Sequence, residues 1–273
     1  MIRKLYPEGK SKAFSLSYDD GVEQDVRLVG LLNRYGLKGT FNLNSGLMQQ
    51  GFCWIHESGL AIRRLPESVV SMLYTGHEIA SHTFTHTYLD NLSEQEIMKE
   101  MAADKYFLER LTGAEVAGYA TPFMYYDDKI ARCARRCGFK YARISEETGD
   151  YTVPDERYRW KGSKFHWDAD LEEFVDGFLG TDRELALCQL VGHSYDLDVM
   201  DAWERMEDIF RKVSSNDDVA AMTNQEIVRY LDAMEASEIT DEYIRNNSPM
   251  KLWFRIDEDV ISVDPGRTYM RKD

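Results

Sequence analysis

Two short segments, far apart in the chain, contain the residue types of a catalytic metal site. Asp19 and Asp20 follow an apolar run at 13–16, and His82 and His86 follow a short apolar run at 78–80. One carboxylate oxygen with two imidazole nitrogens can hold a divalent metal and leave positions open for water and substrate. The second carboxylate is then free to act as a base on water. Either segment alone would also fit a solvated acidic turn or two surface histidines, whereas the two together predict a metal site.

Short apolar runs alternate with segments of helical periodicity along most of the sequence. The predicted strands are 13–17, 39–43, 77–80, 116–120, 140–143, 185–191 and 219–222. The predicted helices are 24–35, 66–74, 94–111, 127–136, 171–178, 202–213 and 224–234. Two helix starts are marked by capping boxes, Ser93 with Glu96 and Thr223 with Glu226. This alternation predicts a parallel sheet with crossover helices, either open or closed into a barrel.

Both of those architectures place functional groups at the carboxyl ends of the strands, where the acidic pair and the two histidines fall. His193 closes another predicted strand. Alone it would be read as a hydrogen-bonded loop histidine. Beside a metal site it becomes a candidate general acid, because the reference pKa of histidine lies near neutrality.

Length, charge and composition restrict the class of protein. The chain has 273 residues, 43% of them hydrophobic, and a net charge of -15. That length suits one α/β barrel, and the negative charge argues against nucleic acid or an anionic membrane as partner. No apolar run is long enough to span a membrane, and the first residues do not form a signal peptide, so we expect a cytoplasmic protein. The four cysteines are scattered and are expected to be reduced.

Four motifs, in order, resemble those of the polysaccharide deacetylase family, the NodB-homology domains of carbohydrate esterase family four. They are Tyr18-Asp19-Asp20-Gly21, His82-Thr83-Phe84-Thr85-His86, Pro122-Phe123 and Leu190 to His193. The resemblance covers about 13–222. It implies a distorted (β/α)7 barrel, a divalent metal that is usually zinc, and a carbohydrate substrate, an amino sugar from which an acyl group is removed.

The resemblance also implies a role for each matching residue. Asp20, His82 and His86 would hold the metal, and Asp19 would be the catalytic base. His193 would be the general acid, and the backbone N–H of Phe123 would donate to the oxyanion. We therefore expect a metal-dependent sugar deacetylase. Hydrolysis of another C–N bond, as in allantoinase-like or formamido-sugar enzymes, and a non-catalytic carbohydrate-binding protein remain alternatives.

The sequence departs from the family at Ala120, where an arginine normally orients the base. Some group from 144–170 should then hold Asp19. Arg159, Lys161 and His166 all lie in that segment, and we favour His166, which can donate to a carboxylate. The rival roles for His166 are an extra metal ligand, a substrate contact, or a cap on the following helix.

Three connections at the predicted catalytic face, 44–65, 121–126 and 144–170, are long and rich in aromatic residues. Such side chains can either form the walls of a sugar-binding groove or bury themselves to hold the loop together. The predicted substrate contacts are Trp54, Tyr125, Trp160, His166 and Trp167. We divide the chain into a barrel, 1–245, and a C-terminal tail, 246–273, that folds as a β-hairpin packed on it.

Overall fold

The computed structural model describes residues 2–48 and 52–271 and is built around one parallel sheet. Eight strands follow one another in the order β10-β11-β2-β3-β6-β7-β8-β9, and β12 pairs with the first half of β2. Their bounds are β2 (Lys12–Asp19), β3 (Thr40–Leu43), β6 (Glu78–Ser81), β7 (Gly118–Ala120), β8 (Tyr141–Glu147), β9 (Trp160–Gly162), β10 (Lys164–Phe165), β11 (Ala186–His193) and β12 (Val219–Ala221). Every pairing within this sheet is parallel.

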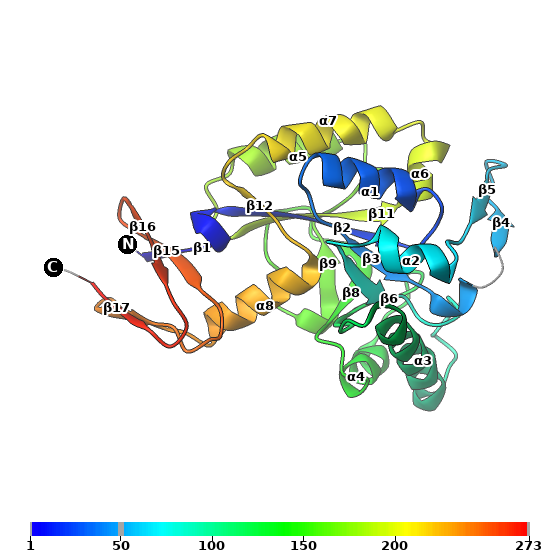
Figure 1. The fold of residues 1–273 in the computed structure, drawn as a ribbon, viewed down its shortest axis with the longest axis horizontal. Coiled ribbons are helices and arrows are strands. Elements are labelled where there is room, and N and C mark those ends of the chain that lie inside the picture. The colour runs from blue at the N-terminus through cyan, green and yellow to red at the C-terminus, as the bar shows by residue number, and fades with distance from the viewer. Residues whose placement is uncertain (1, 49–51, 272–273) are drawn as a thin grey trace.

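The two outermost strands of this row are neighbours in the chain. Only Ser163 separates β9, which pairs with β8, from β10, which pairs with β11. The Ser163 N–H donates to the carbonyl of Gln189 in β11, 2.9 Å away. The sheet is therefore nearly closed into a barrel (Figure 1), which confirms the predicted distorted (β/α)7 architecture.

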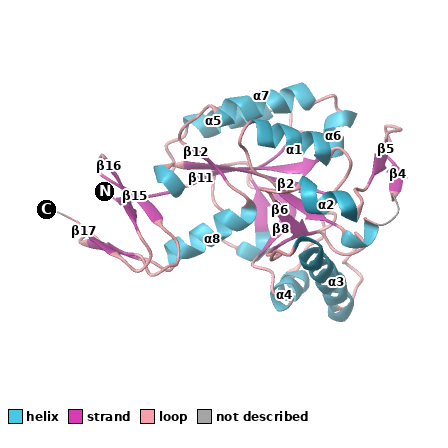
Figure 2. Cartoon of the chain, in the orientation of Figure 1, coloured by secondary structure: helices cyan, strands magenta, loops and turns pink. Residues whose placement is uncertain are grey.

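Helices cover the outside of the barrel (Figure 2). They are α1 (Asp25–Arg34), α2 (Glu67–Leu73), α3 (Glu94–Thr112), α4 (Asp128–Arg136), α5 (Leu171–Gly180), α6 (Ser194–Val199), α7 (Trp203–Ser214) and α8 (Asn224–Glu235). Both predicted capping boxes are present, at the starts of α3 and α8. The short helix α6, which directly follows β11, was not predicted. None of the described helices has the length and apolar composition needed to cross a membrane.

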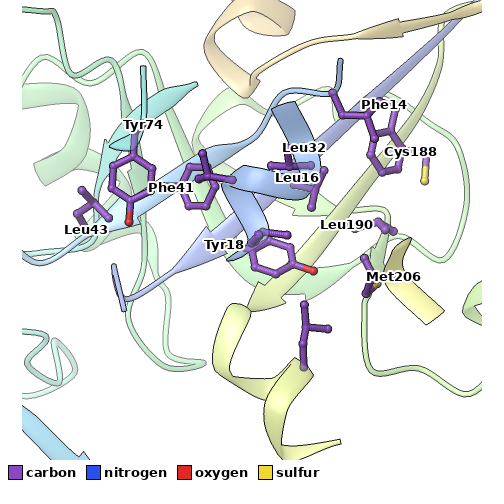
Figure 3. Close-up of a cluster of buried hydrophobic side chains, with 14 of the residues drawn as sticks. Phe14, Leu16, Tyr18, Leu32, Phe41, Leu43, Tyr74, Cys188, Leu190 and Met206 are labelled. Carbon is purple, nitrogen blue, oxygen red and sulfur yellow. The ribbon is translucent and has the colours of Figure 1, made fainter. Parts of the chain in front are cut away.

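Strand β2 shows how the sequence places its functional end. All eight of its residues are buried, because neighbouring strands flank it and helices cover one of its faces. Its side chains alternate, so Phe14, Leu16 and Tyr18 pack into the hydrophobic core beneath the helices (Figure 3). The intervening side chains face the barrel interior, which brings Asp19 to the inner rim.

Smaller sheets flank the barrel. The predicted C-terminal hairpin is formed by β15 (Leu252–Ile256) and β16 (Asp259–Val263), and β1 (Ile2–Leu5) pairs with β15. A second small sheet contains β13 (Glu238–Ile239), β14 (Tyr243–Arg245) and β17 (Thr268–Met270). Both lie at one end of the molecule, beside the N-terminus (Figure 1). At the opposite end, β4 (Cys53–Ile55) and β5 (Ala61–Arg63) form a hairpin.

Trp160 is a core residue, and its predicted contact with substrate is wrong. Its side chain is completely buried, and its ring centroid lies 5.8 Å from that of Tyr141 within a second hydrophobic cluster. The predicted long loop 144–170 in fact contains two very short strands, and β9 turns Trp160 into the protein interior.

Replacing Trp160 by alanine should therefore lower the free energy of unfolding by about 3–5 kcal/mol, because it opens a cavity in a packed core. The same change at Trp167, which is 37% exposed, should cost less than about 1 kcal/mol. Urea denaturation followed by circular dichroism measures both. Equal stability of the two variants would contradict this placement of Trp160.

Candidate active site

The predicted reactive residues meet at the carboxyl ends of the barrel strands. Asp19 ends β2, Asp20 follows it, His82 follows β6, and His193 ends β11. A cavity of about 430 Å³ opens there. It is lined by Asp19, Asp20, His82, His86, Phe123, Met124, Arg143, Ser145, Phe165, Trp167, Val191, Gly192, His193 and Tyr195.

Asp20, His82 and His86 form a compact set of metal-ligand atoms. One atom from each lies within 4.8 Å of the others. The Oδ1 atom of Asp20 is 3.5 Å from Nε2 of His86 and 4.0 Å from Nε2 of His82. This oxygen is buried, and no contact from the described residues meets the geometry of a hydrogen bond to it, although Nη1 of Arg64 forms an ion pair with it at 2.9 Å. One oxygen and two nitrogens so arranged fit a divalent metal.

The hydrogen bond at the far side of the His82 ring supports this fit. Nδ1 of His82 lies 2.9 Å from the carbonyl oxygen of Ala120. A carbonyl only accepts, so Nδ1 carries the proton and Nε2 keeps its lone pair toward Asp20. Burial also lowers the pKa of His82 to about 4, which keeps the ring neutral and able to bind a metal.

The backbone around the cavity is strained. Four of the eight described non-glycine residues with positive φ lie here: Asp20 at 87°, Thr83 at 66°, His86 at 53° and Phe123 at 59°. Such conformations cost of order 1–3 kcal/mol each and persist only where the surroundings hold them. Their concentration at one cavity is typical of a functional site.

Asp104, on α3, holds the turn that presents His82. Its Oδ2 accepts from the hydroxyl of Ser81 at 2.6 Å and from the backbone N–H of His82 at 3.2 Å. Its Oδ1 accepts from the backbone N–H of Ser45 at 2.7 Å and from the Ser45 hydroxyl at 2.5 Å. Burial raises the pKa of Asp104 to about 7, although these hydrogen bonds favour its ionised form.

Arg143 holds Asp19 in place of the arginine missing at Ala120. Its Nη2 donates to Oδ1 of Asp19, and Nδ2 of Asn42 donates to the same oxygen at 2.7 Å. Burial would raise the pKa of Asp19, but Arg143, His82 and His193 outweigh that effect and lower it. Arg143 is the register partner of Ala120 on the neighbouring strand, so it reaches the site from the same height in the barrel.

The predicted pairing of His166 with Asp19 is wrong. His166 is buried, with Nε2 3.3 Å from Oδ2 of Asp196 and Nδ1 2.5 Å from the hydroxyl of Tyr18. A carboxylate only accepts, so Nε2 donates to Asp196 and Nδ1 accepts from Tyr18. The ring packs so closely beneath Gly192 that a Cβ there would lie 2.6 Å from it. His166 is therefore not a substrate contact either.

The two other candidates considered for this pairing lie at the surface. Arg159 pairs with Asp128 at 2.6 Å, and Lys161 pairs with Glu146 at 2.6 Å. Neither lines the cavity.

His193 is held by Asp196, three residues further on. Its Nδ1 donates to Oδ2 of Asp196 at 2.9 Å. Burial disfavours the charged ring, but this hydrogen bond and the carboxylates of Asp20 and Asp19 raise the pKa of His193 to about 9. The imidazole stacks with two aromatic rings: the ring centroid of Tyr195 is 4.8 Å away at an interplanar angle of 21°, and that of Trp167 is 6.2 Å away at 12°.

The other predicted aromatic contacts are divided between the cavity and its surroundings. Trp167 lines the cavity. Trp54 does not, but its ring centroid lies 5.7 Å from that of Tyr195, which is a lining residue. Tyr125 is exposed, donates its hydroxyl to Asp127 at 2.9 Å, and does not line the cavity. Phe123 does line it, and its carbonyl accepts from the Ser145 hydroxyl at 2.5 Å.

The sequence model of the polysaccharide deacetylase family matches residues 7–142 of this chain. A peptidoglycan-N-acetylglucosamine deacetylase of Bacillus cereus is 25% identical over 47% of this chain and 54% of its own length. Chitin deacetylase 3 of Cryptococcus neoformans is 23% identical over 73% of this chain and 45% of its own length. The chain thus spans about half the length of the curated relatives it matches.

The fold has matching solved structures. A candidate polysaccharide deacetylase from Mycobacterium smegmatis superposes with a TM-score of 0.62 and 18% identity, over 85% of this chain and 94% of that one. At this identity the likeness concerns the fold, which is the barrel described above.

Asp104→Ala should lower the free energy of unfolding by more than about 3 kcal/mol, because it leaves several buried donors without an acceptor. Asp104→Asn keeps the size and one acceptor oxygen, so its loss should be clearly smaller. Urea denaturation of the two variants beside the wild type makes the comparison. An alanine variant within about 1 kcal/mol of the wild type would show that Asp104 does not support this turn.

Proposed function

Because this chain belongs to the polysaccharide deacetylase family, we propose that it is a metal-dependent hydrolase that removes the N-acetyl group from an amino sugar in a saccharide. The observation that carries the proposal is the Asp20, His82 and His86 set directly beside Asp19, a carboxylate that points into the same cavity. The metal we propose is zinc, which suits one oxygen and two nitrogen donors.

A metal bound by these three residues would polarise the amide carbonyl and lower the pKa of a water molecule. Asp19 accepts the proton of the attacking water, since Arg143 and Asn42 keep its carboxylate ionised and fixed in direction. The backbone N–H of Phe123 donates to the oxyanion that develops on the substrate, a contribution of roughly 3–4 kcal/mol for a well-placed donor.

His193 completes the reaction by protonating the leaving amine. With a pKa of about 9, it holds a proton at neutral pH. Asp196 fixes the ring through Nδ1, which leaves Nε2 as the atom that delivers the proton. The C–N bond then breaks, and the products are acetate and a free amino sugar.

The aromatic walls of the cavity support a sugar substrate. Phe165 and Trp167 lie parallel, 4.7 Å apart, and Tyr195 forms another part of the lining. Flat apolar surfaces of this kind pack against the C–H faces of a sugar ring. The two curated relatives are named as a peptidoglycan-N-acetylglucosamine deacetylase and a chitin deacetylase. We propose N-acetylglucosamine as the sugar unit.

Acetate release from an N-acetylated chito-oligosaccharide tests the proposal. Protein loaded with zinc should release acetate, and protein treated with a chelator should not. Formate or a ureido product from the corresponding substrates, without acetate, would point instead to another C–N hydrolase. Saccharide binding without any turnover would indicate a carbohydrate-binding protein.

Asp19→Asn should retain zinc but lose activity by more than about tenfold, because an amide cannot accept the water proton. Asp217→Asn, at an exposed position, is the matched control and should leave both properties unchanged. Acetate release and metal content are measured on the same preparations. Activity within about tenfold of the wild type would remove Asp19 from the role of base.

Asp196→Asn should move the alkaline limb of the kcat/KM pH profile to lower pH by about one pH unit or more. The carboxylate raises the pKa of His193, and the acid works only while protonated. Asp198→Asn is the control, since Asp198 lies on the same helix but accepts a hydrogen bond from the indole N–H of Trp203 at 2.7 Å. An unchanged limb in Asp196→Asn would show that His193 is not the group that titrates there.

A further inference from the structure

Arg64 is a second buried arginine in contact with the acidic pair. Its side chain is 5% exposed, and its Nη1 lies 2.9 Å from Oδ1 of Asp20. The same nitrogen is 2.8 Å from Oδ1 of Asn44 and also donates to the backbone carbonyl of Asp20. Each of the two adjacent carboxylates therefore has its own guanidinium, Arg143 for Asp19 and Arg64 for Asp20.

The oxygen that Arg64 contacts is the one that the metal would use. Oδ1 of Asp20 is the atom 3.5 Å from His86 Nε2 and 4.0 Å from His82 Nε2. A guanidinium stays protonated throughout the accessible pH range, so this positive charge cannot be released when a cation arrives. The metal must share the oxygen with a fixed charge of the same sign.

Arg64 is held where it is by more than this ion pair. Its backbone forms a bridge with Val22, two residues after Asp20, and its N–H donates to the carbonyl of Phe52 at 2.9 Å. The guanidinium carbon lies 5.0 Å from the centre of the Trp54 ring. A cation over an aromatic face is stabilised there. The contact with Asp20 is thus built into the fold rather than made by a free surface side chain.

We propose that Arg64 is a positioning residue that weakens the hold of Asp20 on the metal, so that the site binds its cation less tightly than the donor set alone would allow. The inference rests on the metal site of the proposed function. Two effects both lower the affinity of the site for its metal. The ion pair with Asp20 stabilises the metal-free site, and the positive charge of Arg64 repels the cation in the metal-bound site. A weaker carboxylate donor leaves the metal a stronger Lewis acid toward the substrate carbonyl.

Zinc affinity measured by competition with a chromogenic chelator tests this without any substrate. Arg64→Gln should bind zinc at least about tenfold more tightly than the wild type, since a buried like charge is removed. Arg64→Met removes the same charge and keeps a long side chain beside Trp54. If one of the two neutral variants fails to fold, the other still tests the proposal. Arg64→Lys keeps the charge and should stay within about threefold of the wild type.

Arg63→Gln is the matched control, because Arg63 is the adjacent residue but pairs with Glu23 at the surface, 3.3 Å away. It should leave the affinity unchanged. Circular dichroism confirms that each variant is folded. Tighter binding by the neutral variants supports the proposal, including the case in which the wild type binds no zinc and they do.

The direction in which the zinc affinity changes distinguishes this role from a purely structural one. If Arg64 only held Asp20 in place, both neutral variants would bind zinc equally or more weakly, and the inference would be overturned while the proposed function stood. If neither the wild type nor any variant bound zinc, both the inference and the metal site of the proposed function would fail.

Discussion

The site depends on keeping two adjacent carboxylates ionised inside the protein. Asp19 and Asp20 are 6% and 5% exposed, and burial alone would favour their neutral forms. Arg143 and Arg64 reverse this, and the pKa of each carboxyl is lowered. The positive φ of Asp20 turns its side chain toward His86 instead of continuing the alternation of β2. One residue can then bind a cation while its neighbour stays free to take a proton.

Other buried carboxylates fix the frame around this pair. Asp25, at the start of α1, accepts from the hydroxyls of Tyr74 and Ser194, each at 2.6 Å, and so connects α1 to the residue after His193. Asp104 connects α3 to the turn after β6, because it accepts from the Ser81 hydroxyl and the backbone N–H of His82. Burial raises the pKa of both to about 7, and the hydrogen bonds oppose that rise. Polar networks of this kind are stable only when their members are paired, so they also restrict the loops to one arrangement.

The sequence predicted well the site residues that lie together in short motifs. It predicted less well the residues that reach the site through contacts between strands. Asp20, His82 and His86 could be named because two short motifs contain them and strand ends bring them together. Arg143 was missed, although a charge within the apolar run 141–144 already implied a buried cation in need of a partner. Trp160 and His166 were misplaced for one reason. The strands β9 and β10 are too short to show a period, so Trp160 in β9 and His166 directly after β10 were both interpreted as loop residues.

Ala120 shows how a contact made by a missing motif residue can be supplied from a neighbouring strand. In a parallel sheet, residues in register on neighbouring strands lie at the same level along the strands. Their side chains, when they are on the same face, point into the same region. Ala120 and Arg143 are such a pair. A small residue at 120 leaves room for the guanidinium of Arg143 to reach Asp19 from the next strand, and the Ala120 carbonyl remains available to His82. The buried carboxylate of Asp19 needs a cation beside it to stay ionised, and the barrel can supply that cation from more than one position in the sequence.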